Sequence, residues 1–444
     1  MFRLRQLCSS SLQKSKVPRW AMNHTKHVRF IGSFQSTKNK LTIQEVKEKL
    51  GDQLGAQKFY RPTEPLIYSR DKSLSLPQSQ AELSPRKMKD SYDECIIPLG
   101  NSAMEREKYL NFKGAIRTGK ILEDIDVFAV WLCYKHVLLH TQKPGQSAPL
   151  SIVTALVDKI SLSGHTIYPD EDIKMSGHVS WVGKTSLETS MQLEQMESGE
   201  WRKLLHAYFV MVARHPDNQE SAFVNPLILD SPQEEAIFRQ GEANKTRRQK
   251  WSHQSLLRSA PSEQEREVLH NLFLETLDPK AHTFKVRVLP PCSLWMENAK
   301  LKNVIICHPQ ERNLYNKMFG GFLMRQAYEL AWTLAYVHSK TRPVIVNVDD
   351  IWFRQPVEIG SLLYLHAQIV YVKDRDMQVR VHASVKDPEK GKEETTNTFH
   401  FTFTSRGDDL LPRIIPRSYH EAMLYLDGKR HYESALKTAE LNSL

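Results

Sequence analysis

The 444-residue sequence lacks the motifs of several large enzyme classes. It contains no GxSxG nucleophile elbow, no HExxH zinc motif, no P-loop and no glycine-rich Rossmann fingerprint. Its five cysteines include no CxxC pair, and we expect neither a metal nor a redox cofactor. No segment reaches the roughly 20 continuous apolar residues of a membrane-spanning helix. These absences argue against elbow-type serine hydrolases, zinc peptidases, nucleotide-dependent enzymes and proteins that cross a membrane.

Acidic residues are missing from the first 44 positions, which hold nine lysines and arginines together with several serines. Removing these nine charges from the net charge of +10 leaves +1, so the rest of the chain is almost neutral. Such a composition is typical of a mitochondrial transit peptide. We therefore predict that residues 1–44 direct the protein to the mitochondrion, and to its matrix. The alternative is a disordered basic arm that binds phosphate backbones.

The remaining chain divides by composition into five segments. They are a lead-in at 45–87, a first domain at 88–215, a charged helical linker at 216–300, a second domain at 301–412 and a tail at 413–444. In the first domain the pattern predicts a helix at 118–136, followed by strands at 151–160, 177–181, 186–193 and 204–214. Elsewhere we expect helices at 232–240, 261–277 and 419–426. The fold class is therefore α+β, with an antiparallel sheet wrapped around one buried helix in each domain.

The second domain repeats the first. Val157–Ile160 matches Val348–Ile351 at an offset of 191, and two further strand segments match at offsets of 190 and 192. Three nearly equal offsets indicate an internal duplication, and we expect the two copies to pair through their sheets. The helices align at an offset of 202, which places Gly119 on Gly321.

The helix of the second copy begins at a pair of glycines. Phe319, Gly320 and Gly321 lead into apolar residues that recur at helical spacing. Glycine lets a ligand approach the backbone, and a helix N-terminus offers unpaired N–H groups to an anion or a polarised carbonyl oxygen. The glycines therefore mark a candidate site, the alternative being a turn into a core helix.

Asp126 lies on the apolar stripe of the first helix, where the second copy has Tyr328. A buried carboxylate is costly unless it has a partner or a task, and burial raises its pKa toward the range of a general base. Asp126 is therefore a candidate base, the alternative being a buried acid satisfied by a backbone or arginine donor. We expect the neighbouring Glu123 and Asp124 to face solvent or the helix start.

Several stretches resemble the hotdog-fold acyl-CoA thioesterases, in particular the mitochondrial type with two hotdog domains in one polypeptide. The most specific is the Asn313 that stands six residues before Phe319-Gly320-Gly321. The others are Arg86–Tyr92, Gly119–Asp126, Pro149–Ile160, Gly177–Ser186 and Met423–Gly428, so the resemblance spans roughly residues 85 to 430. It implies two tandem hotdog domains and the hydrolysis of acyl-CoA to free fatty acid and coenzyme A.

The resemblance also implies where the chemistry occurs. A site between the domains would pair Asp126, which activates a water molecule, with Asn313, which orients the water or the thioester. The helix start at Phe319, Gly320 and Gly321 would bind the substrate and stabilise the oxyanion. The reciprocal site, with Asn111, Tyr328 and Glu329, lacks the acid, so we predict one working and one degenerate site. We further expect a homo-oligomer of double-hotdog chains, because paired sheets leave edges to cover.

Alternative functions remain open at the level of sequence. A hotdog hydratase would need a catalytic histidine near the start of a central helix, and neither helix has one. The basic run Lys245–Lys250 is expected to be a solvated face, or else to meet the phosphates of coenzyme A. The same run would suit a non-catalytic acyl-CoA-binding or RNA-associated mitochondrial protein, although we expect no nucleic-acid partner.

Overall fold

The computed structural model describes residues 40–53, 77–137, 150–162, 166–197, 199–215, 220–313, 316–389 and 391–441. The predicted transit peptide therefore lies outside the described residues, except for its last five positions. Those five belong to the fold, since the strand Leu41–Thr42 (β1) pairs with Asp93–Ile97 (β3) and Ile43 is buried. The described part of the fold thus includes five residues ahead of the predicted boundary.

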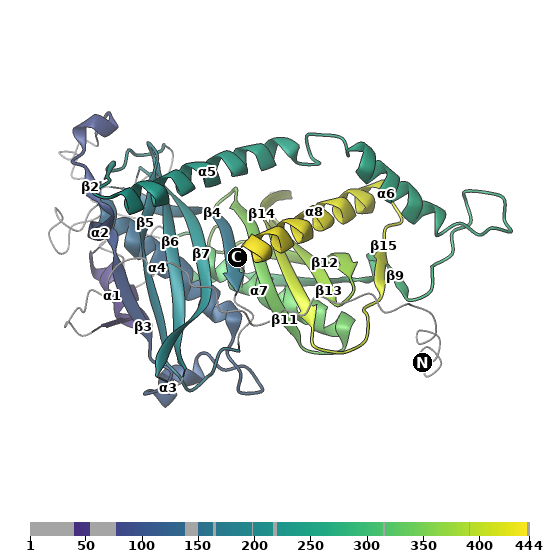
Figure 1. Cartoon of the computed structure of the whole chain (residues 1–444), viewed down its shortest axis with the longest axis horizontal. Helices are drawn as coiled ribbons and strands as arrows, with labels where there is room; N and C mark the ends of the chain where they lie inside the picture. The colour runs from purple at the N-terminus through teal and green to yellow at the C-terminus, as the bar shows by residue number, and fades with distance from the viewer. Residues whose placement is uncertain are drawn as a thin grey trace.

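Each copy of the repeat supplies one long helix and a set of strands (Figure 1). Ahead of and within the first copy lie α1 (Ile43–Gln53), β2 (Arg86–Lys87), α2 (Met88–Ser91), α3 (Ala103–Glu107), α4 (Thr118–Val137), β4 (Ser151–Leu162), β5 (Ile173–Val182), β6 (Ser186–Glu197) and β7 (Glu200–Arg214). The linker holds β8 (Leu227–Ile228), α5 (Pro232–Gln254), α6 (Glu263–Leu274) and β9 (Ser293–Trp295). The second copy and tail hold β10 (Lys300–Ile306), α7 (Gly320–Ser339), β11 (Pro343–Phe353), β12 (Leu362–Lys373), β13 (Asp376–Asp387), β14 (Lys392–Ser405), β15 (Arg413–Ile415) and α8 (Tyr419–Leu441). Short 3-10 turns cover Gln80–Glu82, Met296–Asn298 and Pro309–Glu311.

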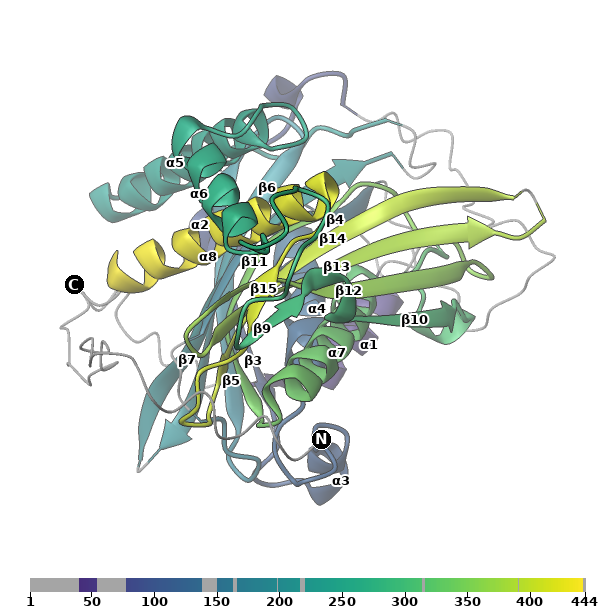
Figure 2. The same ribbon diagram turned by 90° about the vertical axis from the view of Figure 1, so that its right-hand side faces the viewer.

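Eleven of the described strands form one continuous sheet, in the order β1-β3-β5-β6-β7-β4-β11-β14-β13-β12-β10. Apart from the parallel pair of β1 and β3, neighbouring strands are antiparallel. Figure 2 shows α4 and α7 on one side of this sheet and α5, α6 and α8 on the other. The expected α+β class, with antiparallel strands wrapped around a central helix in each copy, is confirmed.

The two copies join at the centre of the sheet, where β4 pairs with β11. Val348 lies opposite Ile160, and Ile351 lies opposite Val157. These two segments are the ones that the duplication matches. Each therefore pairs with its equivalent in the other copy, in antiparallel orientation. The arrangement relates the copies by an approximate two-fold axis and brings α4 and α7 side by side.

Helix α4 is enclosed on all sides, because 17 of its 20 residues are buried. The prediction that Glu123 and Asp124 face solvent or the helix start is wrong, since both are buried. Asp124 accepts hydrogen bonds from the Tyr109 hydroxyl at 2.5 Å and from Lys47 Nζ at 2.7 Å. Charged side chains tolerate burial when they are paired in this way. Their burial could not be predicted from the helical pattern, because it depends on residues of other elements, such as Lys47 and Tyr109 for Asp124.

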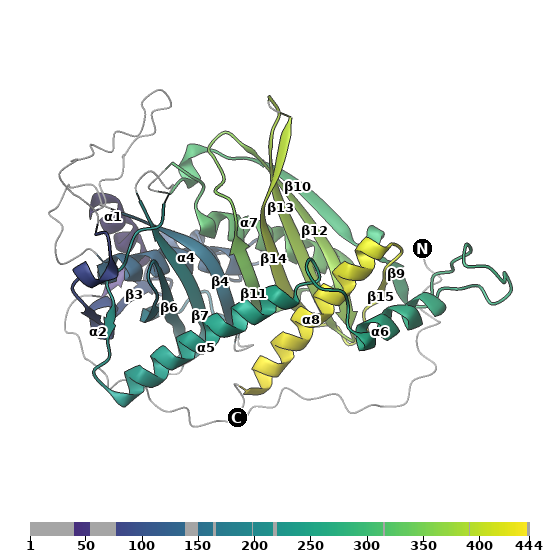
Figure 3. The ribbon, with the colours of Figure 1, turned by 90° about the horizontal axis from the view of Figure 1, so that it is seen from above.

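Helix α5 is longer than predicted, since it continues past residue 240 to Gln254. Seen from above, it lies across the strands of the first copy (Figure 3). The basic run Lys245–Lys250 is therefore not simply a solvated face. Arg248 is buried and forms ion pairs with Asp158 at 3.0 Å and with Glu188 at 2.8 Å. The run holds the helix on the sheet, which is why a mostly polar segment stays helical.

Helix α8 also extends further than predicted, to Leu441 instead of residue 426. It packs on the outer face of the second copy through His431, whose ring stacks on that of His400 in β14 at a centroid distance of 3.8 Å. None of the described helices has an apolar stretch of the length that spanning a membrane requires.

Candidate active site

The N-terminus of α7 meets a buried acid from the first copy. Asp126 lies on α4 and is fully buried. Its Oδ2 accepts a hydrogen bond from the backbone N–H of Gly321 at 2.7 Å, and its Oδ1 accepts one from the Thr154 hydroxyl at 2.7 Å. Phe319 caps the helix with extended backbone and makes no side-chain capping bond. The carboxylate of Asp126 caps the helix instead, and this hydrogen bond between Asp126 Oδ2 and Gly321 N–H joins the two copies.

The environment of Asp126 adjusts its acidity. Burial raises the pKa of this carboxyl to about 6, from an ordinary value of 3.8, while the hydrogen bonds from Thr154 and Gly321 lower the pKa in part. A carboxyl group with a pKa near 6 is ionised at neutral pH and accepts a proton more readily than an ordinary aspartate does. The group is therefore suited to general-base chemistry.

Both glycines at the start of α7 are closely packed, and Gly321 has no room for a side chain. A Cβ atom on Gly320 would lie 3.1 Å from Asp126 Oδ2, and one on Gly321 would lie 2.8 Å from the carbonyl oxygen of Glu123. Real Cβ atoms hardly ever approach backbone to less than 3.0 Å. Glycine thus lets α7 begin directly against α4, and the rings of Phe319 and Phe353 flank the pair.

Asn313 shapes the loop that leads into α7. Its Oδ1 accepts a hydrogen bond from the Lys317 backbone N–H at 3.1 Å, and its own N–H donates to the Lys317 carbonyl oxygen at 2.6 Å. Asn111 forms the same turn in the first copy, where its Oδ1 accepts from the Ala115 N–H at 3.1 Å. The two asparagines are therefore equivalent in structure, as the alignment of the copies predicts.

The reciprocal position holds Tyr328 in place of the acid. A Cβ on Gly119 would lie 3.2 Å from the Tyr328 ring, so this side chain packs on the start of α4 as Asp126 packs on the start of α7. Burial raises the pKa of the Tyr328 hydroxyl to about 12, which leaves the phenol neutral. Glu329 pairs with Arg117 at 2.6 Å. Asn111, Tyr328 and Glu329 all line one cavity of about 380 Å³.

Proteins of known family share much of this sequence. The human protein named acyl-coenzyme A thioesterase 9, mitochondrial, is 51% identical over 400 residues, which cover 90% of this chain and 90% of the human protein. The chain belongs to the acyl-coenzyme A thioesterase 9 family. A mitochondrial acyl-coenzyme A thioesterase 4 from Humulus lupulus is 33% identical over 79% of this chain and 68% of its own length. The thioesterase superfamily profile matches residues 315–392.

Among solved structures, an acyl-CoA hydrolase from Staphylococcus aureus is 24% identical, with a TM-score of 0.32, and covers 34% of this chain and 94% of that protein. The identity to curated acyl-coenzyme A thioesterase 9 proteins, which are named mitochondrial, extends over both copies of the repeat. The mitochondrial location expected from the leader agrees with those names.

Sequence reasoning missed Thr154, whose hydroxyl donates to the candidate base Asp126 in this member of the acyl-coenzyme A thioesterase 9 family. A signal was present, because the strand offset of 191 places Thr154 on Ile345. The second copy has therefore lost both the acid and the hydroxyl that holds it. Comparing the two copies along the strands as well as along the helices would have shown that the second copy differs from the first at both Asp126 and Thr154.

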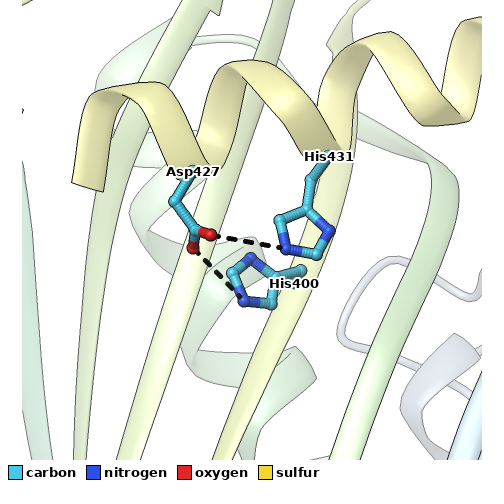
Figure 4. A group of neighbouring side chains, drawn as sticks. All are labelled: His400, Asp427 and His431. Carbon is cyan, nitrogen blue, oxygen red and sulfur yellow. Dashed lines mark ion pairs between the residues drawn. The ribbon is translucent and has the colours of Figure 1, made fainter. Parts of the chain in front are cut away.

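One group of described side chains brings three potential metal ligands together, namely His400, Asp427 and His431 (Figure 4). The Asp427 carboxylate lies 3.9 Å from His400 Nε2 and 4.0 Å from His431 Nε2. The two imidazole planes are inclined by only 19°, so their lone pairs run side by side and do not converge on one point. Asp349 also contacts His431 Nδ1 at 3.3 Å. We interpret the group as the contact that docks α8 on the sheet.

Proposed function

We propose that this chain, an acyl-CoA thioesterase by its family, hydrolyses acyl-CoA to the free acid and coenzyme A where α4 meets the N-terminus of α7. The observation that carries the proposal is the 2.7 Å hydrogen bond between Gly321 N–H and Asp126 Oδ2. It places a candidate base next to a helix end that carries a partial positive charge. Thioester hydrolysis needs both, a base for the water and a positive field at the carbonyl oxygen.

Asp126 acts as the general base. It takes a proton from water while the water oxygen attacks the thioester carbon, and a tetrahedral intermediate forms. Collapse of the intermediate breaks the carbon–sulfur bond, and the same proton passes to the departing thiolate of coenzyme A. Thr154 holds one carboxylate oxygen at 2.7 Å, which fixes the orientation of the base. No covalent intermediate with the enzyme is needed.

The start of α7 stabilises the oxyanion. Once Asp126 is protonated, it accepts the hydrogen bond from Gly321 less strongly, so the N–H becomes available as negative charge develops on the thioester oxygen. The lack of a side chain on Gly320 lets the backbone lie against the carboxylate, and the Phe319 ring packs beside Gly321. We assign this ring to an apolar contact with the acyl group. The Asn313 oxygen is held by its own loop, which fixes the side chain at the entrance to α7, and we assign its amide to orienting the water or the thioester.

The experiment that tests this site measures the release of free coenzyme A with a thiol reagent, over acyl-CoA esters from short to long chains. We expect Asp126→Asn to reduce kcat about 100-fold or more, in line with the usual contribution of a general base, and Asn313→Ala to reduce kcat as well. Asp408→Asn, a change of an exposed aspartate, serves as the matched control and should leave the rate unchanged. Retained turnover in a folded Asp126→Asn protein would exclude the proposed base.

We also propose a matrix location and a homo-oligomer. The edge strand β10 exposes about half of Val304 and Ile306, and an apolar sheet edge is a surface that proteins normally cover. Sedimentation of the wild-type protein and of Val304→Lys tests the assembly, because a charge at this edge should shift it to a smaller species. Protease protection in mitochondria with a ruptured outer membrane tests the compartment.

A further inference from the structure

The cavity of about 380 Å³ lies at the N-terminus of α4, at the position that the two-fold repeat makes equivalent to the Asp126 site. Thr118, Gly119 and Tyr328 line it, and Leu162, Leu204 and Ile345 contribute apolar side chains to the lining. Its size is at the lower end of the range of roughly 300–1,000 Å³ that small-molecule pockets occupy. The volume suits an acyl chain or a similar apolar group.

The cavity has lost the groups that perform hydrolysis. Tyr328 stands where the working site has Asp126, and Ile345 stands where it has Thr154. A neutral phenol with a raised pKa does not accept a proton from water at neutral pH. A thioester bound in this cavity would therefore not be hydrolysed, although the cavity has room for it.

The lining of the cavity carries positive charge. Arg117, Arg342 and Arg406 line it, and of these Arg117 is neutralised by Glu329. Arg342 and Arg406 are exposed and form no ion pair with any residue that the structure describes. Two uncompensated guanidinium groups next to apolar walls recognise a molecule with a negative head and an apolar body.

We propose that this cavity binds an acyl-chain anion, either a free fatty acid or an acyl-CoA, without hydrolysing it. The apolar chain lies against Leu162, Leu204 and Ile345, and the carboxylate or phosphate lies at Arg342 and Arg406. Because α4 carries both this cavity at its start and Asp126 two turns later, occupancy here stabilises the helix that holds the proposed base. The binding claim stands apart from the proposed mechanism.

The test uses the full chain and two probes that the enzyme does not consume. Decanoate stands for the free acid, and S-decyl-coenzyme A, a thioether, stands for the ester. Isothermal titration gives the number of molecules bound per chain for the wild type and for the double variant Arg342→Ala/Arg406→Ala. The double variant Arg258→Ala/Arg266→Ala, which removes two arginines outside the cavity, is the matched control.

We expect one binding site per chain, which takes up one equivalent of probe and whose affinity for the probe falls at least tenfold in Arg342→Ala/Arg406→Ala. The affinity of this site should be unchanged in the control. If decanoate shows this equivalent, the ligand class is the free acid. If only S-decyl-coenzyme A shows it, as a second equivalent beside the one at the Asp126 site, the class is the ester. If neither probe has an equivalent that depends on these two arginines, the proposal is wrong, whether or not the chain hydrolyses acyl-CoA.

Discussion

The carboxylate of Asp126 accepts a hydrogen bond of 2.7 Å from the backbone N–H of Gly321, a residue 195 positions further along the chain. A strand of the first copy holds the other oxygen, through Thr154. The acid is therefore fixed by donors from both halves of the molecule. Any change in how the halves pack alters both the position and the pKa of this group.

The pH dependence of turnover should report the ionisation of Asp126. Its pKa is raised to about 6, and only the deprotonated form accepts a proton from water. We therefore expect kcat to rise as the pH increases through about 6 and to level off above that value. The measurement is kcat at saturating substrate between pH 5 and 8.5, with circular dichroism to verify folding at each pH. A rate that does not change across pH 6 would contradict the assignment.

Thr154→Val should move this pH profile. The substitution removes a hydrogen bond that favours the ionised form, so the pKa of Asp126 rises and the acid limb shifts to higher pH. A hydrogen bond to a charged group contributes about 1.5–3 kcal/mol, which corresponds to a rate at pH 6 that is lower by about sevenfold or more. Thr154→Ser retains the hydroxyl and should behave like the wild type. An unshifted midpoint in the valine variant would show that Thr154 does not tune the base.

Gly321→Ala should destabilise the protein and slow the reaction. The added methyl group would lie 2.8 Å from the Glu123 carbonyl oxygen and 2.7 Å from the Phe319 ring, so α7 must shift away from Asp126. Overpacking of this kind costs about 1–3 kcal/mol. Gly51→Ala in α1 is the control, because nothing lies within 4 Å and alanine favours a helix by about 0.5–1 kcal/mol. Thermal unfolding of both variants should show opposite shifts in Tm.

Arg248→Met should unfold at a much lower temperature than the wild type. Removal of the guanidinium leaves the buried Glu188 without its cation and leaves Asp158 with only the half-exposed Arg247, and breaking a buried ion pair costs about 3–5 kcal/mol. Arg239→Met, on the same helix but with an exposed side chain, should change stability by no more than about 0.5 kcal/mol. Equal Tm values for the two variants would mean that the buried pairs do not hold α5 on the sheet.

Much of the fold could be predicted because the two copies repeat the same local pattern. The helices α4 and α7 and the matched strands that became β4 and β11 are strongly periodic, so their type was readable. The full lengths of α5 and α8 were not, since their sequences are mostly polar and they are held by contacts with distant strands, as at Arg248. Asp126 was detectable as a carboxylate in an apolar stripe. Thr154 and Asp124 were not placed, because their partners are far away in the sequence, and Glu123 was not placed because its burial depends on Arg325 of the second copy as well as on the nearby Lys120.

The antiparallel pairing of β4 with β11 in a single chain has a consequence for how the two copies can evolve. In a dimer of two identical chains, every substitution appears in both halves and alters both interface sites together. Here each half is encoded separately, so an exchange such as aspartate for tyrosine at one helix leaves the opposite site untouched. Fusion of the copies thus allows one site to keep its reaction while the other acquires a different task.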